Sequence, residues 1–172
     1  MTHIRKLVTY AARWGIKVRM GFELDRHDTR EYNDGPDQYD IMTWSTKPVI
    51  VSGLKSHGEW PWLLHEIAHA ICPTKPEDTK ELVDTTGIEL LSIEYLKLPF
   101  RDWEQWQNGF VVGKLIGCVS AHSWINAPPS WRKSAMIKAC NEARARGHFH
   151  PKTSEPLFRL YRLKDGKRVA IS

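Results

Sequence analysis

Apolar side chains recur every three to four positions in several stretches of this chain, which is the period of an amphipathic helix. The first stretch spans residues 4–14 and is followed by Gly15, a residue that suits the C-terminal end of a helix. With proline, capping residues and glycine as start and stop signals, the same pattern predicts four further helices. They span residues 61–71, 74–98, 103–117 and 130–146.

Shorter stretches with strand-like patterns predict a small sheet. Residues 18–22 alternate between apolar and polar or small side chains, which indicates a strand. Residues 39–44 and 48–51 predict two more strands joined by a short connection. Near the C-terminus, two strand-like runs flank a Lys-Asp-Gly-Lys turn that is typical of a hairpin. We therefore expect an α+β fold that is mainly helical, with a small, mostly antiparallel sheet packed beside the helix over residues 61–71.

Length and composition favour one folded domain over residues 1–172, with a basic hairpin or extension over residues 148–172. No apolar run approaches the roughly 18 residues that a membrane span needs. No long apolar segment follows the N-terminus, so a secretory signal is not expected. The three cysteines, Cys72, Cys118 and Cys140, are odd in number and lack metal-ligand spacing. This predicts a reducing compartment and hence a cytoplasmic protein.

The charge of the chain is unevenly distributed. The formal net charge is +5, but residues 131–172 carry 11 Lys and Arg against 3 Asp and Glu. That segment has a net charge of +8, and the first 130 residues have a net charge of −3. A basic segment of this kind can bind nucleic acid or an acidic partner, although a solvated surface is its more common meaning.

The chemistry of the chain is concentrated in residues 62–71, Trp-Leu-Leu-His-Glu-Ile-Ala-His-Ala-Ile, which contain a His-Glu-x-x-His motif. Residues four apart on a helix lie one turn above each other, so His65 and His69 can aim both imidazoles at one ion. Zinc accepts histidine nitrogens in a tetrahedral shell, and Glu66 can act as a base without being a ligand. The alternative is a core helix with two histidines whose hydrogen bonds are satisfied. The buried stripe of this helix is predicted to hold Leu64, Ala68 and Ile71, with Ile67 beside it.

A catalytic zinc normally has three protein ligands and one open position, so the motif needs a third ligand. A metzincin would place Gly at position 72 and His at position 75, where this chain has Cys72 and Lys75. That class is excluded, and a carboxylate on the following helix is the alternative. The candidates are Glu77, Glu81, Asp84, Glu89 and Glu94.

A His-Glu-x-x-His motif followed by a glutamate on a later helix resembles the gluzincin metallopeptidases, and most closely their compact members, the minigluzincins. Nineteen residues lie between His69 and Glu89, which is the thermolysin-like separation. The resemblance therefore implies that Glu89 is the third zinc ligand. It also implies a zincin-like fold and one catalytic Zn²⁺ as the cofactor.

The residues around Glu89 fit this role, because they are small or apolar and a buried acid needs a partner such as a metal. The alternatives are an exposed acid at position 89, Glu81 or Asp84 as the ligand, or Asp84 as a group that orients a ligand histidine. Gly87 would cost about 1 kcal/mol in a helix relative to Ala, but it permits close approach to the zinc helix. The predicted face around Glu89 holds Leu82, Thr85, Thr86 and Ile93.

A weaker resemblance is to peptidase domains of the ImmA/IrrE kind, in which a similar zinc helix precedes a helix with a Leu-Leu-x-Pro-like tail. Residues 94–99, Glu-Tyr-Leu-Lys-Leu-Pro, are similar to that tail. Glu89 is not followed by the Ala-Asn pattern of that group. The resemblance to the gluzincins covers roughly residues 48–99, which are predicted to form an edge strand, the zinc helix and the glutamate helix.

The resemblance to zinc metallopeptidases implies that zinc lowers the pKa of its bound water, and that Glu66 takes the proton and later passes it to the leaving amine. A further donor usually stabilises the oxyanion. We favour His122 for this role, and the alternatives are Tyr95, His57 and Tyr161.

The substrate cleft is less clearly marked in the sequence. Residues 49–51 are either a core strand or an edge that pairs with an extended peptide. Trp60 and Trp62 flank the zinc helix and can line a cleft. Four other tryptophans are expected to pack into the small core rather than to line a ligand site. They are Trp103, Trp106, Trp124 and Trp131.

These observations predict a zinc-dependent metallopeptidase that hydrolyses peptide bonds of a peptide or protein substrate. The predicted metal ligands are His65, His69 and Glu89, and the predicted catalytic residues are Glu66 and His122. One alternative is a regulatory zincin-like protein that acts on one specific partner. The other is a basic nucleic-acid-binding protein with a non-catalytic metal site. No membrane partner is expected.

Overall fold

The computed structural model describes residues 2–20, 40–41, 49–52, 56–72, 79–109, 127–164 and 167–170. The chain divides into two compact units, each of which is described by itself. Unit 1 comprises Met1–Pro73 and Leu160–Ser172, and unit 2 comprises Thr74–Arg159. None of the helices in the described ranges is long and apolar enough to cross a membrane.

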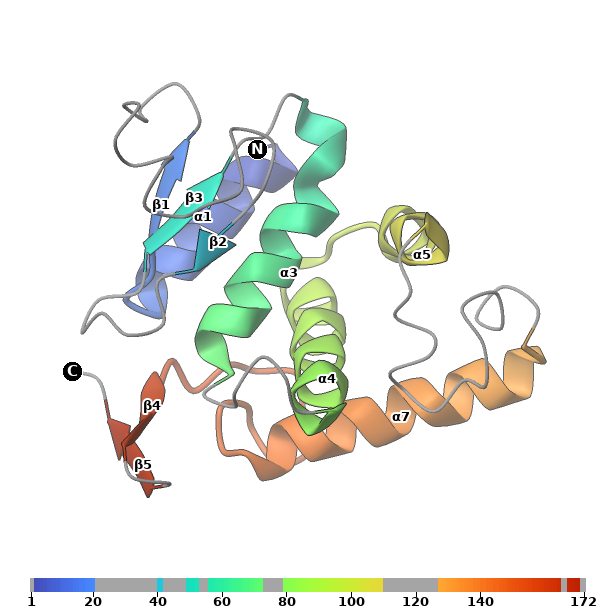
Figure 1. The fold of residues 1–172 in the computed structure, drawn as a ribbon. Helices are drawn as coiled ribbons and strands as arrows, with labels where there is room; N and C mark the ends of the chain where they lie inside the picture. The colour runs from blue at the N-terminus through green and yellow to red at the C-terminus, as the bar shows by residue number, and fades with distance from the viewer. Residues whose placement is uncertain are drawn as a thin grey trace. The chain divides into compact units, whose positions relative to one another are not determined.

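Unit 1 contains a three-stranded mixed sheet (Figure 1). The strands are β1 (Lys17–Met20), β2 (Asp40–Ile41) and β3 (Val49–Ser52), in the order β1-β3-β2. The central strand β3 pairs in parallel with β1 and antiparallel with β2. A separate antiparallel hairpin, β4 (Tyr161–Lys164) and β5 (Lys167–Ala170), also belongs to this unit.

Two helices pack with the sheet of unit 1. Helix α1 (His3–Arg13) contacts β1, and α3 (Trp60–Ile71), preceded by the 3-10 turn η2 (His57–Glu59), contacts β2, β3 and α1. Thr2 caps α1, since its hydroxyl oxygen accepts the backbone N–H of Arg5 at 3.2 Å. The ring of His3 stands edge-on to the Trp60 ring, with centroids 5.8 Å apart, and so ties the beginnings of the two helices together. The apolar stripes of both helices are buried in this core.

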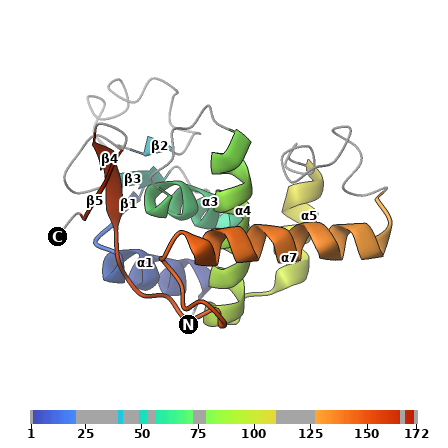
Figure 2. The same cartoon turned by 90° about the horizontal axis from the view of Figure 1, so that it is seen from below.

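Unit 2 is built from the helices α4 (Thr79–Leu96), α5 (Phe100–Gly109) and α7 (Pro129–Ala145). Figures 1 and 2 show α7 running across α4. The crossing is made by small residues, because a Cβ built on Gly87 would overlap the carbonyl oxygen of Ala139 and approach the Cβ of Ala143 to 2.9 Å. Ala139 and Ala143 are both fully buried. The close approach that Gly87 permits is therefore to α7, where the sequence had suggested the zinc helix.

The ends of α4 and α7 follow from their last residues. Lys97 adopts a left-handed conformation with φ of 53°, and the N–H of Leu98 donates to the carbonyl of Ile93 at 3.0 Å, which closes the end of α4. Gly147, with φ of 85°, follows α7 as predicted. Helix α4 ends two residues before the predicted end at residue 98, and α7 ends one residue before the predicted end at residue 146.

The sequence-based expectation of a mainly helical protein is confirmed. The expectation of a mostly antiparallel sheet is not, because β3 has one parallel and one antiparallel neighbour. The suggestion that residues 49–51 present an edge to a peptide is wrong, since both edges of β3 are already paired. Helix α5 begins at Phe100 rather than at residue 103. The expected hairpin near the C-terminus is present as β4 and β5.

Candidate metal site

The motif lies on α3, a helix that is buried along most of its surface. Pro61 occupies the first turn, where its missing N–H costs nothing, and the N–H of Cys72 closes the last turn on Ala68 at 2.9 Å. The predicted stripe is confirmed, because Leu64, Ile67, Ala68 and Ile71 are each fully buried.

One face of α3 is less buried than the rest. Trp62, Glu66 and His69 are half-buried, whereas the other residues of the helix are buried. Their i, i+4, i+7 spacing places them on one side of the helix, with His65 beside them. This face therefore brings the imidazole of His69, the carboxylate of Glu66 and the ring of Trp62 to the strip of α3 with the most access to solvent, with the buried imidazole of His65 next to it.

The imidazoles of His65 and His69 point at each other. Their Nε2 atoms are 2.9 Å apart, and the two rings are nearly perpendicular, at 88°, with centroids separated by 4.4 Å. His65 is only 7% exposed. Two neutral rings make this contact when one Nε2 carries a proton and the other accepts it.

This arrangement fits a zinc ion. Two nitrogens bound to one tetrahedral zinc at 2.0–2.1 Å lie about 3.3 Å from each other. The observed separation of 2.9 Å is slightly shorter, and small rotations of the two rings would open it. Both rings make this contact through Nε2, so the same type of nitrogen on each ring is close enough to its partner to share an ion after such rotations.

Glu89, on α4 of unit 2, is 1% exposed, so the alternative of an exposed acid is wrong. Its Oε2 accepts two hydrogen bonds from α5, one from the indole Nε1 of Trp103 at 2.8 Å and one from Nε2 of Gln107 at 3.2 Å. Trp103 is fully buried and Gln107 is 2% exposed. The carboxylate is thus held in a defined orientation by two buried donors.

The surroundings of Glu89 also match the prediction. Thr85, Thr86 and Ile93, which were expected to share its face, are all buried. The donors Trp103 and Gln107 were not anticipated. Their i, i+4 spacing on one predicted helix was a weak signal that both face the same way, but it does not identify the partner.

The other candidate carboxylate ligands differ from Glu89 in burial or lie outside the described part of the chain. Glu94 is exposed on α4. Glu81 and Asp84 lie in the first turns of α4, and their side chains are outside the described part. Glu77 lies outside the described residues altogether.

The candidate oxyanion donors are mostly outside the described part. His122 lies outside the described residues, so its assignment stays a prediction. His57 and Tyr161 lie in η2 and β4, and their side chains are not described. Tyr95 is half-buried near the end of α4, where its ring stands edge-on to Phe158 at 6.4 Å.

The tryptophans divide between core and surface. Trp60 is 1% exposed, so it is a core residue rather than a wall of a cleft. Trp62 is half-buried on the same face as Glu66. Trp103 is buried, as expected, but Trp131 is 36% exposed and does not seal a core. Trp124 lies outside the described residues.

Across the ranges that the structure describes, no group of three or more His, Cys, Asp or Glu side chains is arranged to hold a metal ion. The histidine pair belongs to unit 1 and Glu89 belongs to unit 2. Comparison of the chain with protein-family models, with curated proteins and with solved structures finds no match.

Proposed function

We propose that this protein is a zinc-dependent metallopeptidase with a zincin-like α+β fold. The observation that carries the proposal is the imidazole pair on α3, whose Nε2 atoms are 2.9 Å apart on the partly exposed face of an otherwise buried helix. Two ligands of one tetrahedral zinc lie about 3.3 Å apart, so small rotations of these two rings would bring their Nε2 atoms to the separation that a shared ion requires.

In this proposal Glu89 is the third ligand. Its support is the spacing of nineteen residues from His69 in the sequence, together with its burial and its two donors. Carboxylates that bind metals are usually themselves held by hydrogen bonds, which fix their orientation. Trp103 and Gln107 have this relationship to Glu89, and they act through it rather than on the substrate.

A zinc ion held by these residues would supply Lewis acidity, which brings the pKa of a water molecule near 7 and polarises a carbonyl group. The residues of the chain do the rest. Glu66 lies on the partly exposed face of α3 beside His69, where its carboxylate would accept a proton from the attacking water and return it to the leaving amine. Trp62 lies one turn earlier on the same face of α3 and offers an apolar surface beside the Glu66 carboxylate.

The exchange of Glu66 for Gln tests this proposal. We expect Glu66→Gln to retain one zinc per chain and to lose peptide hydrolysis, because the amide cannot accept the proton but leaves the imidazoles in place. A matched control is Glu59→Gln, a half-buried acid just before α3, which should leave hydrolysis unchanged. Hydrolysis that survives Glu66→Gln would rule out Glu66 as the base.

The breadth of substrates distinguishes a general peptidase from a regulator. A general peptidase should cut an unfolded protein such as casein at many sites, whereas a regulatory zincin should cut one partner or none. A mass-spectrometric map of casein fragments, with zinc and after chelation, separates these two forms of the proposal.

A further inference from the structure

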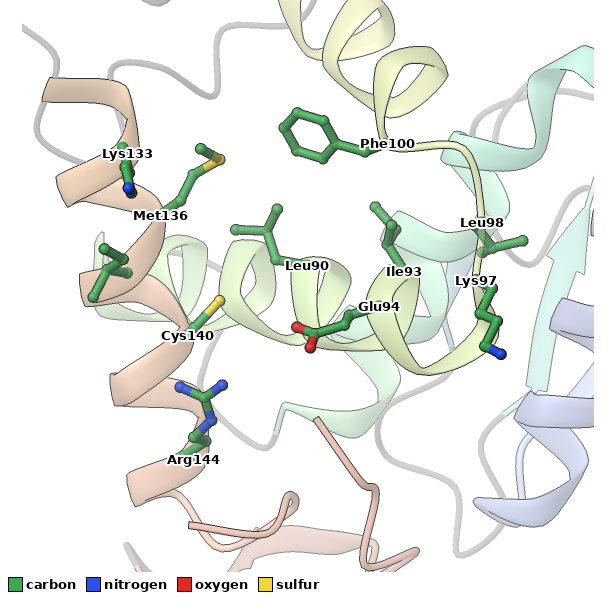
Figure 3. A pocket seen from close by; sticks show the side chains of 11 residues that line it. Leu90, Ile93, Glu94, Lys97, Leu98, Phe100, Lys133, Met136, Cys140 and Arg144 are labelled. Carbon is green, nitrogen blue, oxygen red and sulfur yellow. The ribbon is translucent and has the colours of Figure 1, made fainter. Parts of the chain in front are cut away.

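Unit 2 contains an apolar groove that takes no part in the proposed zinc site. Its volume is about 520 Å³, and it is lined by residues of α4, of the α4–α5 connection and of α7. Figure 3 shows Leu90 and Ile93 of α4, Phe100 at the start of α5 and Met136 of α7 around the same hollow. A groove of this size is within the range of pockets that bind ligands, about 300–1,000 Å³.

Two of the apolar side chains that line the groove are exposed to solvent, whereas Leu90, Ile93 and Leu98 are buried. Ile137, which lines the groove from α7, is 51% exposed, and Phe100 is 38% exposed. Exposed large apolar side chains that gather in one hollow mark an interaction site more often than a plain surface. Met136 adds a flexible, polarisable side chain of the kind that adapts to a partner.

The rim of the groove is positively charged. Lys97, Lys133 and Arg144 line it against one acid, Glu94. Lys97 and Lys133 are exposed and lie on opposite sides of the apolar residues in Figure 3. Arg144 also donates to the carbonyl of Thr153 and to the side chain of Asn141. An occupant that carries negative charges on either side of an apolar strip would therefore match this surface.

The structure of unit 2 also limits the form of that occupant. The strands of the described part lie in unit 1, and unit 2 is built there from helices and one isolated bridge. The described part of unit 2 therefore offers an extended peptide no sheet edge with which to pair its backbone groups. A helix satisfies its own backbone hydrogen bonds and can place a row of apolar side chains between two helices.

We infer that this groove docks an amphipathic, acidic helix of a partner protein. The helix presents apolar residues at i, i+3 or i+4, and i+7 to Leu90, Phe100 and Ile137, and acidic residues on its flanks to Lys97 and Lys133. A second copy of this chain fits less well, because a self-complementary contact would bring the same lysines together. The inference rests on unit 2 alone and does not depend on the zinc site.

Selection from a peptide library tests the inference. The library consists of phage-displayed peptides of about 14 residues, or roughly four helical turns, with apolar residues fixed at the helical spacing and the other positions randomised. The target is the full chain. We expect the enriched peptides to be acidic, and their affinity for the Ile137→Glu variant to be at least about tenfold weaker. The matched control is Leu157→Glu, an apolar residue that is 39% exposed but does not line the groove, and it should change affinity by less than about twofold.

Charge reversal tests the rim. Binding of one enriched peptide is followed by fluorescence anisotropy, and we expect Lys133→Glu to weaken it about fivefold. Changing an acidic flanking residue of the peptide to Lys should restore its binding to the Lys133→Glu variant. Lys152→Glu, an exposed lysine outside the groove, is the control.

Several results would overturn the inference. They are no enrichment, enrichment of basic peptides, or equal binding to Ile137→Glu and to the unchanged chain. Self-association detected by light scattering and abolished by Ile137→Glu would assign the groove to a second copy. Binding of a small amphipathic anion such as dodecanoate, without any helical peptide, would assign it to a small ligand.

Discussion

The buried hydrogen bond between Trp103 and Glu89 provides a test of whether this carboxylate serves a metal or only the core. Trp103→Phe removes the indole N–H that donates to Glu89 Oε2 at 2.8 Å, while keeping an aromatic ring in a fully buried position. A hydrogen bond to a charged group contributes about 1.5–3 kcal/mol. The smaller ring leaves part of the indole space empty, which adds about 1 kcal/mol. We therefore expect the metal-free protein to lose about 2.5–4 kcal/mol of stability.

The effect on zinc is the more informative quantity. If Glu89 is a ligand, loss of the Trp103 donor should weaken zinc binding by about 10- to 100-fold, the usual cost of losing a group that orients a ligand. Chemical denaturation with and without zinc, together with a competition titration for zinc, measures both effects. The control is Trp131→Phe, because Trp131 is 36% exposed and lies on α7.

Stability and affinity need not change together. A Trp103→Phe variant that is destabilised as expected, but binds zinc as tightly as the unchanged protein, would refute the link between Trp103 and the metal. Glu89 would then be a core acid whose bonds from Trp103 and Gln107 serve the packing of unit 2.

Three further predictions concern unit 2. Gly87→Ala should lower the free energy of unfolding by about 1–3 kcal/mol in urea titrations, because the added Cβ would overlap Ala139. The cost of this overlap exceeds the gain of about 1 kcal/mol in helix propensity. An effect no larger than that of Gly58→Ala would contradict this packing. Burial raises the pKa of the half-buried Cys140 thiol from 9.0 to about 11, so alkylation followed by peptide mass spectrometry should stay slow until the pH approaches that value. Because the folded state holds this proton more tightly, the stability it contributes below pH 9 should be lost as the pH rises through about 11, and rapid alkylation at pH 8 would exclude such a shift. Lys97→Gly should stabilise the protein by about 1 kcal/mol in thermal unfolding, because glycine adopts the left-handed conformation without strain. A loss of stability would show that the contacts of the Lys97 side chain contribute more free energy than its left-handed backbone costs.

The helices could be predicted well because their signals are local. The apolar period, Pro61 and the glycines after residues 14 and 146 placed α1, α3 and α7 within a residue or two of their observed bounds. The His65–His69 contact follows from the same local geometry, since residues four apart on a helix are neighbours.

The sheet and the surroundings of Glu89 could not be predicted in the same way. The strand pattern identified β3 as extended, but its parallel pairing with β1 depends on how distant segments meet. The helical pattern around Gly87 indicated a close contact, but the partner, α7, is about fifty residues further along the chain. The bonds from Trp103 and Gln107 to Glu89 likewise join two helices through tertiary packing, which no periodicity reports.

The most direct test of the central claim is a zinc titration of the metal-free protein by calorimetry. The account predicts one zinc per chain, and a loss of at least about 100-fold in affinity for His69→Gln. His150→Gln, a half-buried histidine outside α3, should bind zinc like the unchanged protein. A protein that binds no zinc after reconstitution, or that loses as much affinity through His150→Gln as through His69→Gln, would contradict the metal site on α3.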